Sequence, residues 1–144
     1  RTNRYFLTRK KNPFLTEFAW RYEGKLDIEA MKYIASLLPE YTDFSCFSKK
    51  GSQTGSTICY ITESYFIEEP GLLIYHVKAN RFLRNMVRAI AGTMIDVGKG
   101  FMDEAGFRRL ITSGSRSDAG ESVPAHGLFL EDIEYPENFR MKVG

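Results

Sequence analysis

The sequence lacks several features that would point directly to a class of protein. Its 144 residues include only two cysteines, Cys46 and Cys59, which are too few for a disulfide framework or a cysteine-rich metal site. No apolar run is long enough to cross a membrane, and the N-terminus does not have the layout of a signal peptide. We therefore expect a cytoplasmic protein without membrane contact, in which both thiols are reduced.

Excess charge and sequence repeats are also missing. The formal net charge is only +2, so any affinity for nucleic acid has to come from local clusters of Lys and Arg. The composition, 43 % hydrophobic and 26 % charged, is typical of an ordinary soluble protein. The chain begins at Arg1 without a methionine and enters strand-like sequence almost at once. We expect a single domain over residues 1–144 that is a piece of a longer protein.

The longest strongly periodic segment is Phe82–Gly98, which reads FLRNMVRAIAGTMIDVG. Placed on a helix, it has one broad apolar stripe that is typical of a core-facing surface. The opposite face has no acidic residue. The pattern predicts a helix with Asn80 as its N-cap and Gly98 at its end. The stripe contains Phe82, Leu83, Met86, Val87, Ile90, Ala91 and Met94, and the opposite face contains Arg81, Arg84, Asn85, Arg88 and Gly92.

Two interpretations of this basic face remain open. It is either a solvated surface, as charged helix faces commonly are, or a surface that binds an anion. Arg84 and Arg88 are four residues apart, where like charges repel weakly, so an external negative charge would relieve the repulsion. Gly92 has no side chain on the same face, so a backbone or a ligand could approach the helix closely there.

The rest of the chain predicts an α+β fold: a mostly antiparallel four-stranded sheet with helices packed on one face. Glu69, Pro70 and Gly71 have the composition of a hairpin turn. Asp27 and Asp103 are good N-caps for two further helices. The expected strands are 4–8, 57–68, 72–79 and 128–135; the expected further helices are 28–38 and 103–112; the segment 14–22 is expected to be extended, 43–49 to pack as a turn, and 50–56 and 113–125 to be loops.

Three stretches of this sequence resemble one family. KANRFLRNMVRAIAGTMIDVGKG, residues 78–100, resembles the second signature of the tRNA pseudouridine synthase A family, and SVPAHGLFLEDIEYP, residues 122–136, resembles its closing signature. DFSCF, residues 43–47, is similar to a shorter element that precedes both. The order and spacing agree with the C-terminal half of that family, and the resemblance covers nearly the whole chain.

The resemblance implies an isomerase that makes pseudouridine in the anticodon arm of tRNA, without a metal or an organic cofactor. A uridine is flipped from its stack, an aspartate attacks it, and the base is released, turned and rejoined to the sugar through carbon. The family's arginine, which keeps that aspartate ionised, falls on Arg88. Its pocket-wall leucine falls on Leu128. Arg81, Arg84 and Asn85 are then expected to face RNA, and family members pair as homodimers.

The nucleophile of the family belongs to a GRTDAG-type motif in an N-terminal half that this chain does not contain. The short match RSDAG, residues 116–120, lies where the family has a loop without a catalytic acid. A short match without its structural context is weak, so we expect Asp118 to be a solvated loop carboxylate. The chain is therefore expected to be inactive by itself.

A second departure concerns an aromatic group. The family has a tyrosine in its first C-terminal strand, and the alignment places Asn3 at that position. Tyr5 is two residues further along and on the same face of the strand. Either Tyr5 takes the role of the base-stacking tyrosine, or the chain has lost that group and is a non-catalytic RNA-binding module. A third hypothesis is an arginine face that meets an acidic protein.

Other residues have a structural and a functional interpretation. We expect His126 to be structural or solvated, the cysteines to be packing thiols, and Phe44 and Phe47 to be buried rather than stacked on bases. For a further set of cations, phosphate contact and plain solvation remain equally open. This set is Arg9, Lys10, Lys11, Lys49 and Lys50.

Overall fold

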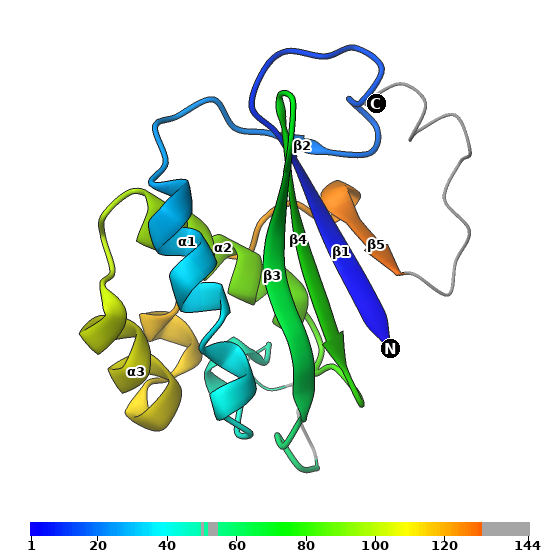
Figure 1. Ribbon diagram of the computed structural model, residues 1–144. Coiled ribbons are helices and arrows are strands. Elements are labelled where there is room, and N and C mark those ends of the chain that lie inside the picture. Colours follow the sequence, from blue (N-terminus) through cyan, green and yellow to red (C-terminus); the bar gives the residue numbers. More distant parts are fainter. Residues whose placement is uncertain (50, 52–54, 131–144) are drawn as a thin grey trace.

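A five-stranded sheet with helices on one face forms the body of the chain (Figure 1). The computed structural model describes residues 1–49, 51 and 55–130. The strands are β1 (Thr2–Thr8), β2 (Trp20–Arg21), β3 (Ile61–Glu69), β4 (Leu72–Ala79) and β5 (Leu128–Leu130). The predicted α+β class and mostly antiparallel sheet are confirmed. The sheet has one strand more than expected, the two-residue β2, which pairs with β1 in parallel.

The strand β1 organises the sheet because it has neighbours along both edges. It pairs with β4 over its whole length on one side. On the other side, its two ends have different partners: Leu7 lies opposite Trp20 of β2, and Tyr5 lies opposite Leu128 of β5. The chain therefore brings residues more than 120 positions apart into one register.

Three helices accompany the sheet: α1 (Ile28–Ala35), α2 (Met86–Gly98) and α3 (Glu104–Ser113). Figure 1 shows them gathered on one side of the sheet, with α2 nearest to its strands. Eleven of the thirteen residues of α2 are buried, so this helix forms the centre of the core. Four short 3₁₀ turns connect the elements: η1 (Leu38–Glu40), η2 (Ser45–Phe47), η3 (Arg116–Asp118) and η4 (Ala125–Gly127). None of the helices in the described part of the chain is both long enough and apolar enough to cross a membrane.

Several local predictions are confirmed. The side chain of Asp27 accepts a hydrogen bond from the Ala30 amide at the start of α1, and Asp103 accepts one from the Gly106 amide at the start of α3. The hairpin β3–β4 turns at Pro70 and Gly71, where Gly71 has a φ of +69°. The segment around Phe44 and Phe47 packs as the turn η2, and both rings are fully buried.

Several boundaries differ from the prediction. The strand expected over 57–68 begins only at Ile61, and the strand expected over 4–8 begins at Thr2. The helix expected over 28–38 ends at Ala35, and Pro39 lies in the separate turn η1. The segment expected to be extended over 14–22 consists of turns as far as residue 18. Leu15 is buried there against Phe6, on the face of the sheet opposite α2. Burial of this leucine requires the compact turn. The expected final strand is described only as far as Leu130, and residues 131–135 lie outside the described range.

The largest correction concerns the start of the helix predicted over 82–98. Helix α2 begins at Met86, since Asn85 has a φ of +68°, a left-handed conformation that asparagine tolerates better than most residues. Arg81 donates hydrogen bonds to the carbonyls of Ser56 (2.9 Å) and Ile58 (3.1 Å), which hold residues 81–83 against the entry to β3. Asn80 is not the cap, because its side-chain oxygen accepts the Tyr60 amide.

Candidate active site

The face of α2 near its N-terminus is covered by the loop that leads from α3 to β5. A Cβ atom on Gly92 would lie 1.7 Å from the carbonyl oxygen of Glu121, so the loop backbone touches the helix where the side chain is missing. The predicted close approach at Gly92 is therefore confirmed, and the approaching group is backbone. Thr93 Oγ1 accepts the Gly120 amide (3.0 Å) and donates to the Ala89 carbonyl, which fixes the loop one residue before Glu121.

Arg88 is held by the same loop. Its Nε donates to the Val123 carbonyl (2.8 Å), and the Val123 amide donates to the Arg88 carbonyl (3.2 Å). These two bonds fix both the backbone and the guanidinium of a half-buried arginine. No carboxylate forms an ion pair with Arg88 in the part of the chain that the structure describes. The two terminal nitrogens of its guanidinium suit a bidentate contact with a carboxylate that comes from elsewhere.

Tyr5 lies next to this arginine and is 3 % exposed. Its hydroxyl donates to the carbonyl of Pro124 (2.6 Å). Pro124 directly follows Val123, whose carbonyl holds Arg88. Burial raises the pKa of the Tyr5 hydroxyl, and the positive charge of Arg88 acts in the opposite direction. Tyr5 therefore stays neutral and donates a hydrogen bond at physiological pH, within electrostatic range of the guanidinium.

Asn3 and Leu128 complete the group. Leu128 lies opposite Tyr5, and Asn3 lies opposite Leu130, so these side chains share one face of the sheet. Tyr5 and Leu128 belong to the core packed beneath α2, and this is the face that carries Arg88. Asn3 is buried as well, with 6 % exposure. The structure thus brings together four of the predicted site residues from β1, α2 and β5.

Comparison with known proteins gives this arrangement a family. A family model described as tRNA pseudouridine synthase matches residues 41–136. The chain belongs to this family. It is 43 % identical over 137 residues to the tRNA pseudouridine synthase A of Parabacteroides distasonis. This match covers 95 % of the chain and 54 % of the relative. The chain is 44 % identical over 140 residues to the tRNA pseudouridine synthase A of Porphyromonas gingivalis. This match covers 96 % of the chain and 56 % of that relative.

A more distant relative matches nearly the whole chain in the same way. The tRNA pseudouridine synthase A of Chlorobaculum tepidum is 36 % identical over 135 residues, covering 94 % of this chain and 55 % of the relative. The chain therefore spans about half the length of the curated relatives that it matches. The resemblance read from the sequence motifs is confirmed at the level of the family.

The remaining residues of the predicted basic face do not share one surface. Arg81 is tied to the carbonyls near β3, Arg84 is exposed on the turn before α2, and Asn85 donates to Ser122 Oγ (2.5 Å). The prediction that one helix face carries Arg81, Arg84 and Arg88 is therefore wrong. Because α2 begins at Met86, Arg88 is the only one of these three arginines that lies in the helix.

Residues that we expected to be structural have structural environments. Asp118 is exposed, and its carboxylate accepts from the backbone and hydroxyl of Ser115 in a capping box around η3. Both cysteines are buried and free. Burial raises the pKa of the Cys46 thiol to about 12 and raises the pKa of Cys59 too, so neither is poised as a nucleophile. His126 is exposed in η4. Among the described residues, His, Cys, Asp and Glu form no group of three that could hold a metal ion.

The basic loop has a partly structural role. Arg9 donates to the carbonyls of Tyr22 and Gly24, which holds the turn after β2 against β1. Lys10 and Lys11 lie on the surface of the same loop, and Lys49 follows η2, while Lys50 is outside the described residues.

Sequence reasoning missed the residues that hold the site together. Val123 and Pro124 act through their backbone carbonyls, which every residue has, so no side-chain signal marks them. Thr93 lies on the buried side of α2, where a threonine is unremarkable in a periodic pattern. The Gly and Ser content of the loop was the one available hint, because it permits close packing on the helix.

Proposed function

We propose that the protein containing this chain isomerises uridine to pseudouridine in tRNA, and that the chain contributes one half of the active site. The observation that carries this proposal is Arg88: a guanidinium fixed by the Val123 carbonyl, half-buried, and without a carboxylate partner among residues 1–49, 51 and 55–130. Leaving an arginine unpaired in a partly buried site is unfavourable unless another group meets its charge. An aspartate from the missing half would do so.

In this proposal Arg88 keeps the aspartate ionised and therefore nucleophilic. The flipped uracil rests against the apolar side chain of Leu128, and Tyr5 or Asn3 borders it on β1. The carboxylate forms a covalent bond to the nucleoside while the base is detached from C1′ of the ribose. The base turns and its C5 forms the new bond to C1′; C5 then loses its proton to solvent, N1 takes up a proton from solvent, and the carboxylate is freed. The chain's own residues thus bind, orient and stabilise charge.

The finer features rest on the family resemblance. We expect the modified uridine to lie in the anticodon arm, the protein to act in the cytoplasm as a homodimer, and Arg81, Arg84 and Asn85 to contact RNA. Of these three, exposed Arg84 is best placed for a phosphate contact, since Arg81 and Asn85 already bond to the protein.

One observation favours a second candidate function. Asn3 stands where the family has a tyrosine, and the nearest aromatic side chain, Tyr5, already donates its hydroxyl to Pro124. A non-catalytic RNA-binding module that retains the scaffold would explain both facts.

The test measures release of tritium from C5 of uridine in tRNA, because forming the new carbon bond displaces that hydrogen. The full-length protein should release tritium, and the 144-residue chain alone should not. Turnover by the chain alone would contradict our placement of the nucleophile and make Asp118 the first residue to test. Full-length protein that binds tRNA without releasing tritium would support the binding module.

A further inference from the structure

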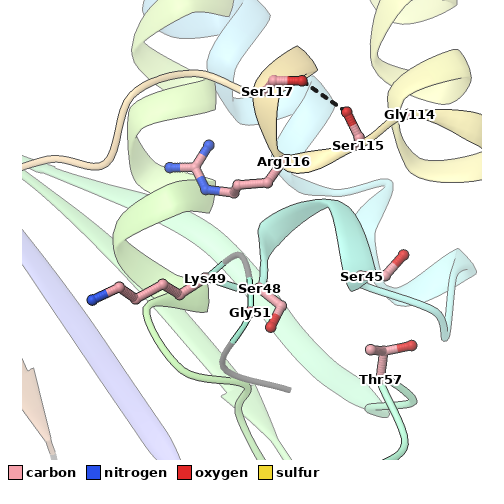
Figure 2. A pocket seen from close by; sticks show the side chains of 9 residues that line it. All are labelled: Ser45, Ser48, Lys49, Gly51, Thr57, Gly114, Ser115, Arg116 and Ser117. Atoms are coloured by element: carbon pink, nitrogen blue, oxygen red, sulfur yellow. Dashed lines mark hydrogen bonds between the residues drawn. The ribbon is translucent and has the colours of Figure 1, made fainter. Parts of the chain in front are cut away.

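A second polar site lies beside the candidate active site and includes Lys49, one of the cations for which phosphate contact and solvation remain open. It is an open pocket of about 360 Å³ between η2, the segment before β3, and the turn η3 that follows α3 (Figure 2). The polar side chains that line it include Ser48, Lys49, Thr57, Ser115, Arg116 and Ser117.

The charges at this pocket favour an anion. Its two charged lining residues, Lys49 and Arg116, are both cationic, and no carboxylate is among the lining residues that the structure describes. Figure 2 shows both side chains extending toward one edge of the pocket, away from the hydroxyls of Ser45 and Thr57. The nearby carboxylates face other donors: Asp43 accepts the Thr57 hydroxyl (2.6 Å), and Asp118 accepts the amide and hydroxyl of Ser115.

Ser48 supplies an independent sign of a missing ligand. It is 5 % exposed, and its Oγ has no hydrogen-bond partner among the described residues. A buried hydroxyl without a partner is unfavourable, and native proteins rarely leave one unsatisfied. In Figure 2 this hydroxyl points into the space between η2 and Thr57. Its O–H is available as a donor to a ligand, whereas the hydroxyls of Thr57 and Ser115 already have protein acceptors.

Arg116 is positioned in advance. Its Nη1 donates to the Gly120 carbonyl (2.9 Å) and its Nη2 to Ser122 Oγ (2.7 Å), two uncharged acceptors. No described carboxylate forms an ion pair with it. Ser122 immediately precedes Val123, which holds Arg88. The pocket and the candidate active site therefore share one loop, and an extended ligand could occupy both.

We propose that this pocket binds a backbone phosphate of the RNA substrate, near the nucleotide that enters the candidate active site. This inference rests on the proposed function, because it takes RNA as the ligand. Phosphate contacts fix the register of a nucleic acid on a protein, and an open pocket beside a base site suits that role. Ser48 donates its hydroxyl to the phosphate, and Lys49 and Arg116 neutralise its charge.

The test uses the full-length protein and three variants: Ser48→Ala, Lys49→Gln and, as a matched control, Lys25→Gln. Lys25 is an exposed lysine two residues before Asp27, whose amide donates to the carbonyl of Gly98 at the far end of α2. Binding of tRNA is measured over a range of salt concentrations. In parallel, inorganic phosphate is titrated at constant ionic strength while the amide resonances of Ser48 and Arg116 are followed by NMR.

We expect Lys49→Gln to weaken tRNA binding about 3- to 10-fold and to reduce the slope of log K against log[salt] by about 1, as the loss of one phosphate contact requires. Ser48→Ala should weaken binding about 3-fold without lowering Tm, because it removes a hydroxyl that has no protein partner. The control Lys25→Gln should change neither tRNA binding nor Tm. Phosphate should shift the two resonances in the wild type and much less in Ser48→Ala.

Three outcomes would overturn the proposal. In the first, Ser48→Ala and Lys49→Gln bind tRNA as Lys25→Gln does. In the second, phosphate shifts the resonances but no variant alters tRNA binding, which identifies a site for an adventitious ion only. In the third, Ser48→Ala lowers Tm, which gives the hydroxyl a structural partner. Failure of the wild type to bind tRNA would instead contradict the proposed function, and the phosphate titration would still decide whether the pocket binds anions.

Discussion

Arg88 on α2 and Arg108 on α3 are both partly exposed arginines, but the protein meets their charges in different ways. Arg108 donates to Glu104 (2.9 Å), Glu40 (3.3 Å) and the hydroxyl of Tyr41 (2.8 Å). Its bond to Glu104 is the main reason why the pKa of Arg108 is raised. Among the residues that the structure describes, the Arg88 side chain donates to the Val123 carbonyl alone. One arginine is paired within the chain, and the other is positioned but not neutralised.

This difference separates architecture from function. Arg108 joins α3 to the turn η1 and needs nothing from outside the chain. Arg88 has its backbone and side chain fixed by a loop, at the cost of leaving its charge unmatched among the described residues. A fold keeps such a group when a ligand or another polypeptide segment completes it. Four predictions test this contrast, beginning with the largest effect.

Replacing the two arginines should have opposite consequences. Arg88→Ala in the full-length protein should reduce tritium release about 10³-fold, the order of magnitude lost with a key electrostatic group. The variant should stay folded, with a stability loss of about 1–2 kcal/mol because the Val123 carbonyl loses its donor. Arg108→Ala should leave turnover nearly unchanged and lower Tm by less than about 5 °C, because exposed ion pairs contribute little. Near-normal turnover in Arg88→Ala, or equal losses of activity in both variants, would break the contrast.

Gly92 and Gly106 provide the same contrast at the level of packing. Gly92→Ala should destabilise the fold by about 3 kcal/mol, because its Cβ overlaps the Glu121 carbonyl and pushes the loop from α2. Activity should fall as well, since the loop holds Arg88. At Gly106 on α3 the nearest atom to an added Cβ is a side-chain oxygen of Asp103, 3.2 Å away, so Gly106→Ala should be nearly neutral. Unfolding in urea measures the free energy of unfolding of both variants. Similar unfolding midpoints for the two variants would contradict the role given to Gly92.

Tyr5 should show a smaller effect on stability. Tyr5→Phe removes the donor to Pro124 and leaves that carbonyl unsatisfied, which should cost about 1–2 kcal/mol. Tyr60→Phe is the matched control, because the Tyr60 side chain is 57 % exposed. Urea unfolding at neutral pH compares the pair, and a loss in Tyr5→Phe no larger than in Tyr60→Phe would show that the bond does not anchor β1 to the loop.

The smallest predicted effect depends on pH. The hydrogen bond from Arg108 is the main reason why the pKa of Glu104 lies below its ordinary value of 4.5, with Tyr33 contributing next. A carboxylate with a lowered folded-state pKa stabilises the protein above the ordinary pKa and loses that contribution as pH falls through the folded pKa. The stability advantage of wild type over Glu104→Gln should therefore be present at neutral pH and shrink below pH 4.5.

Arg88 sharpens this last comparison. Since no described carboxylate pairs with it, the stability difference between wild type and Arg88→Gln in this chain should not change over the same pH range. Unfolding in urea at several pH values measures both differences. An acid-dependent difference for Arg88→Gln would reveal a carboxylate partner within the chain and remove the basis of the contrast.

The sequence predicted elements well where neighbouring residues decide the structure. Asp27 and Asp103 mark helix starts because a short carboxylate satisfies amides within its own turn. Pro70 and Gly71 mark the hairpin because their backbone preferences match its turn. Prediction failed at Asn85, where apolar periodicity continues across residues 82–85. There the bonds from Arg81 to distant carbonyls outweigh local helix preference, and the pattern contains no sign of them.

The candidate site shows the same division. The basic residues of the segment 81–88 are visible in the sequence, and the family motifs single out Arg88 and Leu128. What separates Arg88 from Arg81 and Arg84 is the contact that each one makes. Ser48 and Arg116 lie 68 positions apart in the chain, and no local pattern connects them.

The sequence by itself determined the fold class, the N-caps of α1 and α3, the hairpin and the family, since these depend on residue type and on spacing along the chain. Only the tertiary structure showed that Arg88 is fixed by a loop without a carboxylate partner among the described residues, because that depends on the loop packed at Gly92. It also decided that a serine hydroxyl is buried without a partner beside two cations. The physical reason is that unmatched charge and unsatisfied hydrogen bonds are properties of neighbours in space.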